Sequence, residues 1–96
     1  MVKLRAGNCR LKPSQRRQLL AWLRRAINLG EKVGDFLLDI SVRRIGRCFE
    51  MIASVHDAAG DFECRIRGQT WRDVCRWIAR TVAVKVHAQR LALVPA

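Results

Sequence analysis

The sequence predicts a single α+β domain: a helix, a three-stranded antiparallel sheet and a second helix, with both helices packed on one face of the sheet. Apolar residues recur at helical spacing near both ends of the chain and alternate at period two between them. The chain has 96 residues, 50% of them hydrophobic, which suits one modest core and excludes a disordered chain. We assign residues 13–96 to this domain and residues 1–12 to a basic arm or a short edge strand.

The first helix is predicted from Gln15 to Leu29. The pair Pro13-Ser14 is typical of a helix start, with Ser14 as the N-cap, and Gly30 favours a stop directly after the helix. Five apolar residues repeat every three or four positions and form one face, with Trp22 at its edge; they are Leu19, Leu20, Leu23, Ala26 and Ile27.

Residues 35–43 are interpreted as the first strand of the sheet. Phe36, Leu38, Ile40 and Val42 alternate with mainly polar neighbours, which is the period of a half-buried strand. A helix is the alternative, because the apolar residues between positions 33 and 40 also fit a helical repeat.

The next two strands form a hairpin, from 47 to 56 and from 62 to 67, around a turn at 57–61. Pairing His56 with Asp61 places Val55 opposite Phe62 and makes one face uniformly apolar. The same register sets Glu50 opposite Arg67 on the other face, so charge pairing and burial favour one alignment.

The second helix is predicted from Thr70, its N-cap, to about Arg90, with Asp73 in the first turn. Its apolar face consists of Trp71, Val74, Cys75, Ile78 and Val82. Alternation in residues 81–86 leaves a strand as the alternative. This order of elements resembles that of double-stranded-RNA-binding domains, but those domains open their last helix with a lysine pair, which residues 70–73 lack. The resemblance therefore extends to topology alone.

Charge is the strongest functional signal. Residues 1–30 carry eight basic side chains and no acid, so +8 of the net charge of +11 lies there. Such a field attracts polyanions, and nucleic acid is the first candidate. Two arginine stripes, Arg17/Arg24/Arg25 and Arg72/Arg76/Arg80, occupy the polar faces of the helices, and Lys3 and Arg5 extend the basic region. The predicted nucleic-acid-binding residues are Arg10, Lys12, Arg16, Arg17, Arg24, Arg25, Arg72, Arg76 and Arg80.

Trp22 and Trp77 lie at the edges of the apolar arcs. They are predicted either to pack at the boundary of the core or to stack on bases and anchor a partner.

Catalytic and metal-binding patterns are missing from the sequence. The four cysteines form no Cys-x-x-Cys pair and fit no zinc spacing, and neither histidine has a set of catalytic partners. We expect free thiols, no cofactor, no enzyme activity and a cytoplasmic location. No apolar run approaches the roughly 20 residues that span a membrane.

The sequence thus predicts a small non-enzymatic protein that binds DNA or RNA mainly through phosphate contacts. The alternative is a protein-interaction module, such as a small phage or mobile-element inhibitor that docks on an acidic surface of a larger protein. A third possibility is binding of the first helix to an anionic membrane surface. The choice between DNA and RNA, the identity of a protein partner and the oligomeric state stay open. Convergence of the two arginine stripes on one face favours nucleic acid.

Overall fold

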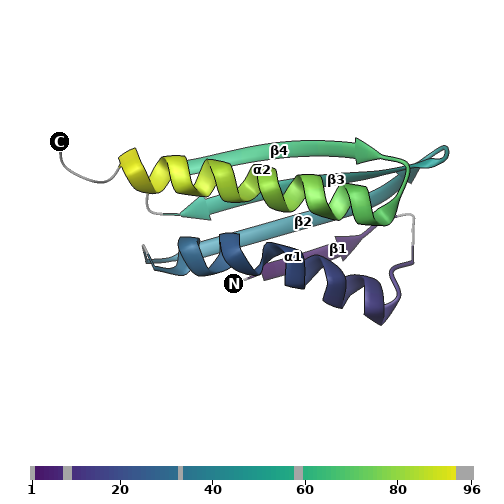
Figure 1. Ribbon diagram of the computed structural model, residues 1–96, viewed down its shortest axis with the longest axis horizontal. Helices are drawn as coiled ribbons and strands as arrows, with labels where there is room; N and C mark the ends of the chain where they lie inside the picture. The colour runs from purple at the N-terminus through teal and green to yellow at the C-terminus, as the bar shows by residue number, and fades with distance from the viewer. Residues whose placement is uncertain (1, 8–9, 33, 58–59, 93–96) are drawn as a thin grey trace.

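Four strands and two helices make up the computed structural model, which describes residues 2–7, 10–32, 34–57 and 60–92 (Figure 1). In chain order the elements are β1 (Val2–Ala6), α1 (Pro13–Glu31), β2 (Phe36–Ile45), β3 (Cys48–Asp57), β4 (Gly60–Gly68) and α2 (Trp71–Ala92). The sheet order is β1-β2-β3-β4, with β1 parallel to β2 and the other pairs antiparallel.

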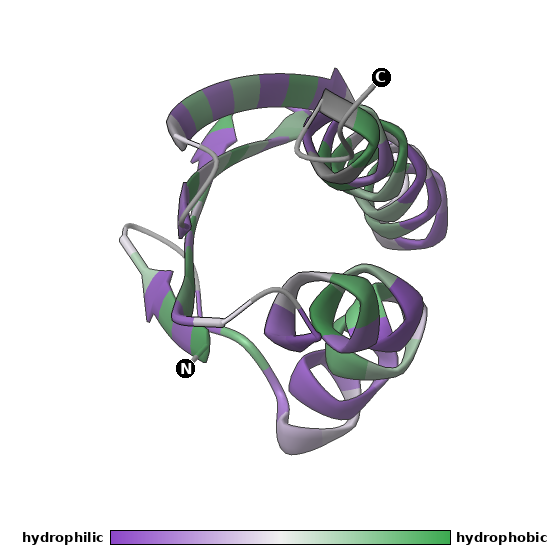
Figure 2. Cartoon of the chain, turned by 90° about the vertical axis from the view of Figure 1, so that its left-hand side faces the viewer, coloured by the Kyte–Doolittle hydropathy of each residue, from purple (hydrophilic) through white to green (hydrophobic). Residues whose placement is uncertain are grey.

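The α+β prediction is confirmed, with both helices on the same face of a sheet that curves around them (Figure 2). The sheet differs from the prediction in having a fourth strand. Residues 2–6, for which the sequence left a basic arm or an edge strand, pair in parallel with β2, so that Val2 lies beside Leu38 and Leu4 beside Ile40. A five-residue strand with three apolar residues is too short a pattern to predict pairing with a parallel strand more than thirty residues away.

The remaining strand predictions are confirmed. Residues 36–45 form a strand, and the hairpin has the expected register, with His56 opposite Asp61 and Glu50 opposite Arg67. Residues 81–91 continue α2, because nothing in that segment breaks the helix. Thr70 caps α2 as predicted, since its Oγ1 accepts a hydrogen bond of 3.2 Å from the Asp73 backbone N–H.

Both predicted ends of α1 were wrong by two residues. The helix begins at Pro13, which fits the first helical position, and Lys12 rather than Ser14 is the N-cap. The Gln15 Oε1 accepts a hydrogen bond of 2.8 Å from the Lys12 backbone N–H. At the other end the helix continues through Gly30 to Glu31. Gly30 is buried, and a Cβ atom there would overlap the ring of Phe36.

The core lies between the sheet and the inner faces of the helices. Leu20, predicted on the apolar face of α1, is instead 40% exposed because it lies at the edge of the buried arc. Trp71 is half-buried against the core and meets the Phe49 ring edge-on, with 5.6 Å between ring centres. The fully buried large apolar side chains of the described helices and strands are Leu19, Leu23, Val74, Ile78, Val82, Val86, Leu38, Ile40, Val42, Met51 and Val55.

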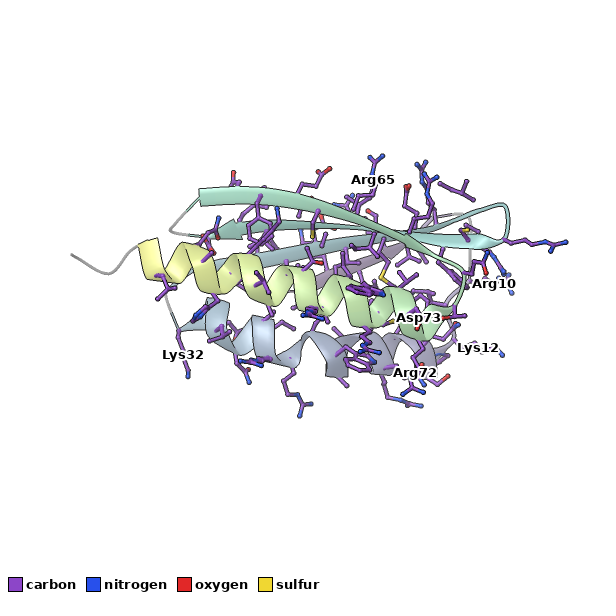
Figure 3. All side chains as sticks on the ribbon, turned by 45° about the horizontal axis from the view of Figure 1, so that its top comes forward. Arg10, Lys12, Lys32, Arg65, Arg72 and Asp73 are labelled. Carbon is purple, nitrogen blue, oxygen red and sulfur yellow. The ribbon has the colours of Figure 1, made fainter. Side chains whose placement is uncertain are left out.

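Chain direction brings both helix starts to one end of the sheet. β1, β2 and β4 run the same way, toward the β2–β3 turn at residues 46–47, which we name the turn end. Because α1 follows β1 and α2 follows β4, both helices begin there and run back in parallel (Figure 1). Arg10, Lys12 and Arg72 accordingly lie at the turn end, and Lys32 lies at the opposite end (Figure 3).

Replacement of Gly30 by alanine is expected to destabilise the protein by about 1–3 kcal/mol, the usual cost of overpacking a core. The sign is the informative part, because glycine to alanine inside a helix normally stabilises by about 0.5–1 kcal/mol. Urea denaturation measures the change in the free energy of unfolding.

The matched control is Asn28→Ala, an exposed site on the same helix, which should change stability by less than about 0.5 kcal/mol. Adding Phe36→Leu to Gly30→Ala should cost less than the sum of the single changes, because the two side chains compete for one space. A stabilised Gly30→Ala variant would contradict the packing of Phe36 on α1.

Candidate nucleic-acid interface

The helical layer presents a basic outer surface. All nine predicted nucleic-acid-binding residues are exposed. None of the nine forms an ion pair with an acidic residue in the described part of the chain. Asp39, one acid that could have neutralised a stripe, is paired with Arg5 on the sheet instead. The positive charge of the helices is therefore not cancelled locally.

One contact fixes the orientation of the α2 stripe. The Lys85 ammonium lies over the Phe62 ring, 5.5 Å from its centre, so that flank of α2 faces β4. Arg76 precedes Lys85 by nine positions, which is about half a turn around the helix at ~100° per residue. Arg72 lies on the same flank as Arg76. Both arginines therefore turn away from β4 toward α1, and Arg80 points outward from the layer.

The α1 stripe divides. Because the two helices are parallel and packed side by side, opposite flanks face one another. On α1 the flank toward α2 holds Trp22 and Arg25, while Arg17 and Arg24 lie on the outward side beyond it, at ~100° per residue from the buried arc. The layer thus brings Arg25 near the α2 stripe and leaves Arg17 and Arg24 on the same face but pointing away from α2.

The turn end gathers the other predicted residues. Arg10, Lys12 and Arg72 all lie at this end (Figure 3), and Arg16 lies in the first turn of α1. The positive ends of two parallel helix dipoles meet at the same place. No acid occupies the first turn of α1, and Asp73 is the acid in the first turn of α2.

Two tryptophans break the charged surface of the helical layer. Trp22 is 44% exposed and Trp77 is 52% exposed. The Arg80 guanidinium carbon lies 6.0 Å from the centre of the Trp77 ring, so the aromatic face is held beside a positive charge. Half-exposure agrees with both readings that the sequence left open, packing of Trp22 and Trp77 at the boundary of the core and stacking on bases or a partner.

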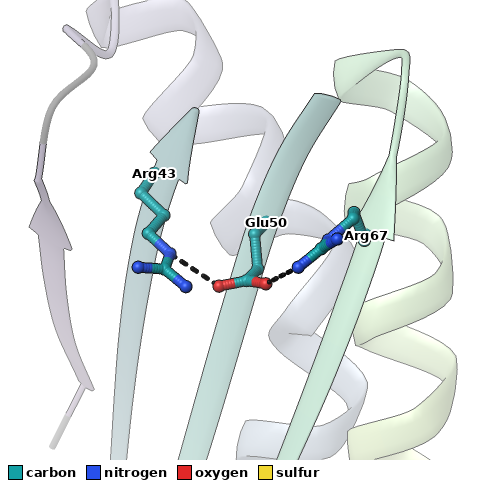
Figure 4. A network of polar contacts seen from close by, with 3 residues as sticks. All are labelled: Arg43, Glu50 and Arg67. Atoms are coloured by element: carbon teal, nitrogen blue, oxygen red, sulfur yellow. Dashed lines mark hydrogen bonds and ion pairs between the residues drawn. The ribbon is translucent and has the colours of Figure 1, made fainter. Parts of the chain in front are cut away.

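The sheet's open face, opposite the helices, carries a buried carboxylate that sequence reasoning placed only in part. Glu50 is 0% exposed and accepts hydrogen bonds from Arg43 Nε at 2.6 Å and Arg67 Nη2 at 2.8 Å (Figure 4). These two hydrogen bonds hold the pKa of Glu50 below its usual value of 4.5, and the bond from Arg67 has the larger effect. Burial of the carboxylate acts in the opposite direction. The hairpin register predicted Arg67, whereas Arg43 requires the β2–β3 register.

Two buried thiols are the other described groups with a shifted pKa. Burial raises the pKa of the Cys64 thiol and raises that of Cys75 to about 12, so both are uncharged at neutral pH. Among the residues that the structure describes, no three His, Cys, Asp or Glu side chains come close enough to hold a metal ion. Neither of the described helices is long and apolar enough to cross a bilayer.

Comparison with known proteins identifies the fold. No protein-family model matches the chain, and no curated protein sequence matches it. The N-terminal domain of Protein Y from Thermus thermophilus superposes with a TM-score of 0.77 at 13% identity, over 93% of this chain and 94% of that one. A ribosomal subunit interface protein from Coxiella burnetii superposes with a TM-score of 0.76 at 6% identity, over 94% and 97% of the two chains. The chain therefore shares one βαβββα architecture with both along nearly its whole length.

Replacement of Glu50 by glutamine is expected to remove a pH-dependent part of the stability. A carboxylate whose folded pKa is depressed stabilises the fold fully above its unfolded value, near 4.5, and loses this effect as the pH falls through the folded pKa. The thermal midpoint of the wild type should thus exceed that of Glu50→Gln by a constant margin at neutral pH. The margin should shrink below about pH 4.5.

Glu63→Gln is the control, because Glu63 is an exposed carboxylate on the neighbouring strand. Its midpoint should follow that of the wild type across the pH range. Parallel curves for wild type and Glu50→Gln would show that the buried carboxylate does not set the acid sensitivity.

Proposed function

We propose that this protein binds RNA on a ribosomal subunit, mainly through phosphate contacts from arginines on its helical layer. One observation carries the proposal: unpaired arginines point outward from two parallel helices of a fold shared with a ribosomal subunit interface protein. The proposed role is non-enzymatic and needs no cofactor. A ribosomal partner also agrees with the cytoplasmic location expected from the sequence.

The physical chemistry of the surface suits phosphates. Arginine forks match phosphate oxygens, and their attachment to packed helices fixes the positions of their Cα atoms. Binding to a polyanion releases condensed counterions, so affinity should fall steeply with salt. RNA is favoured over DNA because the likeness in fold is to a protein of the ribosomal subunit interface, and A-form RNA is recognised largely by shape and backbone contacts. The proposed contact residues are Arg10, Lys12, Arg16, Arg17, Arg24, Arg25, Arg72, Arg76 and Arg80.

A second candidate function follows from the tryptophans. Trp22 and Trp77 are half-exposed within an arginine-rich surface, which also fits an anchor for an acidic protein partner. Nuclease treatment separates the two functions in an affinity capture from lysate. A partner that survives nuclease favours protein docking, whereas loss of all captured material favours RNA.

Removal of two charges from α2 should flatten the salt dependence of RNA binding. In Arg76→Gln/Arg80→Gln, the slope of log affinity against log salt should fall in magnitude by about 2, or about one for each lost phosphate contact. Fluorescence anisotropy with a labelled ribosomal RNA hairpin over a range of salt concentrations measures the slope.

The matched control is Lys3→Gln/Lys32→Gln, which removes the same charge from the other end of the molecule. Its slope should stay near that of the wild type. Equal changes in both variants would mean that net charge, and not the helical surface, governs binding.

Replacement of Trp77 by alanine should weaken binding to RNA that contains unpaired bases more than binding to a plain duplex. Stacking of one base on an aromatic ring is worth about 1–3 kcal/mol, and duplex bases are not available to stack. Trp77→Phe keeps an aromatic face and should recover part of the loss. Equal losses for both RNAs, measured by the same anisotropy assay, would exclude stacking by Trp77.

A further inference from the structure

The open face of the sheet carries a second set of arginines, which the proposed function does not use. Strand register arranges the open-face side chains in rows across the sheet. The charged row nearest the turn end holds Arg43, Glu50 and Arg67, and the next holds Arg5 and Arg65. Arg5 is paired with Asp39 of the following row, so Arg43, Arg65 and Arg67 against Glu50 leave a net charge of +2 on this half of the face.

The other half of the open face has the opposite sign. Its next two rows hold one lysine and three carboxylates, and the members are Lys3, Asp39, Glu63 and Asp61. More acids, Glu31, Asp35 and Asp57, stand beyond them at the same end of the molecule. The row that holds Asp39 and Glu63 is two residues, or about 7 Å, from the row of Arg65, and four residues, or about 14 Å, from the row of Arg43 and Arg67. Arg43 and Arg67 therefore lie beyond the ~8 Å screening length from these acids at physiological salt, whereas Arg65 lies within it but forms no ion pair with Glu63.

The buried carboxylate holds two of these arginines in place without shielding them. Glu50 contacts Arg43 through Nε, so both terminal nitrogens of that guanidinium lie outside the pair (Figure 4). Arg67 uses one terminal nitrogen, Nη2. The two arginine side chains are 52% and 55% exposed while Glu50 is 0% exposed. An approaching anion therefore meets guanidinium groups and not the carboxylate.

Arg65 completes the group from the neighbouring row. It is exposed, forms no ion pair with a described acid, and projects from the open face away from the helices (Figure 3). The sheet curves around the helices, so this face is convex (Figure 2). A convex surface with three outward guanidinium groups, two of them fixed by a carboxylate, fits the phosphates of an RNA backbone.

We propose that Arg43, Arg65 and Arg67 form a second phosphate-binding surface on the open face of the sheet, at the turn end. The helices cover the other face of the sheet, so the protein contacts two RNA segments at once, one on each layer. The identification of the ligand as RNA rests on the function proposed above.

Nuclear magnetic resonance with a 12-base-pair RNA duplex tests this surface, following the α2 backbone amides and the arginine Nε–Hε signals. Two equivalents of duplex should bind, and the signals of Arg43 and Arg67 should shift together with the amides. Arg65→Gln should weaken the second equivalent about tenfold, the scale of one charge-assisted hydrogen bond, and leave the first unchanged. Lys3→Gln removes a charge from the other half of the same face and should leave both unchanged.

A variant that keeps the net charge distinguishes binding by the Arg43–Glu50–Arg67 arrangement from binding by net charge alone. Arg43→Gln/Glu50→Gln leaves the net charge at +11 and should still weaken the second equivalent, provided that far-UV circular dichroism shows a folded protein. Binding of a single duplex with only the α2 amides responding overturns the inference and leaves the proposed function intact. Shifts at the sheet arginines, together with unchanged binding by Arg76→Gln/Arg80→Gln, support the inference and contradict the helical site. Absence of any RNA binding overturns both.

Discussion

The direction of the chain is the constraint on which the rest of the structure depends. β1 and β4 both run toward the turn end, so each helix begins there and runs back along the sheet, and both helices cover the same face. This puts the positive ends of two helix dipoles at one place. The charges of α1 work against that dipole, since its first turn contains Arg16 and no acid and its last residue is Glu31. Helix stability alone would favour the reverse arrangement, so the basic start of α1 does not serve the helix and agrees with the proposed phosphate contacts.

Glu50 imposes a second constraint, on the other face of the sheet. A buried carboxylate is tolerated only with its charge compensated and its oxygens hydrogen-bonded, and Arg43 and Arg67 each supply one bond. These two arginines therefore stabilise the fold and shape the surface together. They differ in this from the helical arginines, which have no structural partner among the described acids and which the fold does not require.

Sequence patterns predicted the elements whose signals are local. The register of the β3–β4 hairpin was predicted to the residue, although the strand ends were not, because a shift by one position would turn Val55 and Ala53 to solvent. Segments whose structure depends on distant partners were harder to predict from the sequence. β1 owes its existence to a parallel neighbour on β2, and the burial of Glu50 needs Arg43 from the preceding strand as well as Arg67. Gly30 looked like a stop signal and is instead the point where α1 approaches Phe36. The split of the α1 stripe likewise follows from the placement of α2, which no local pattern contains.

Proteins that share 13% and 6% identity with this chain have the same architecture, so few particular side chains are needed to specify it. Alternation on the strands and an apolar stripe on each helix are sufficient, and these positions are buried here. The basic surface is not part of that requirement, and an unneutralised charge of this size repels itself and lowers stability. An excess of arginine at exposed positions of a fold that does not need it is therefore the feature most directly tied to binding. On the open face, Arg43 and Arg67 also stabilise the fold through Glu50, so Arg65 is the residue whose replacement tests the proposed phosphate binding with the least effect on stability.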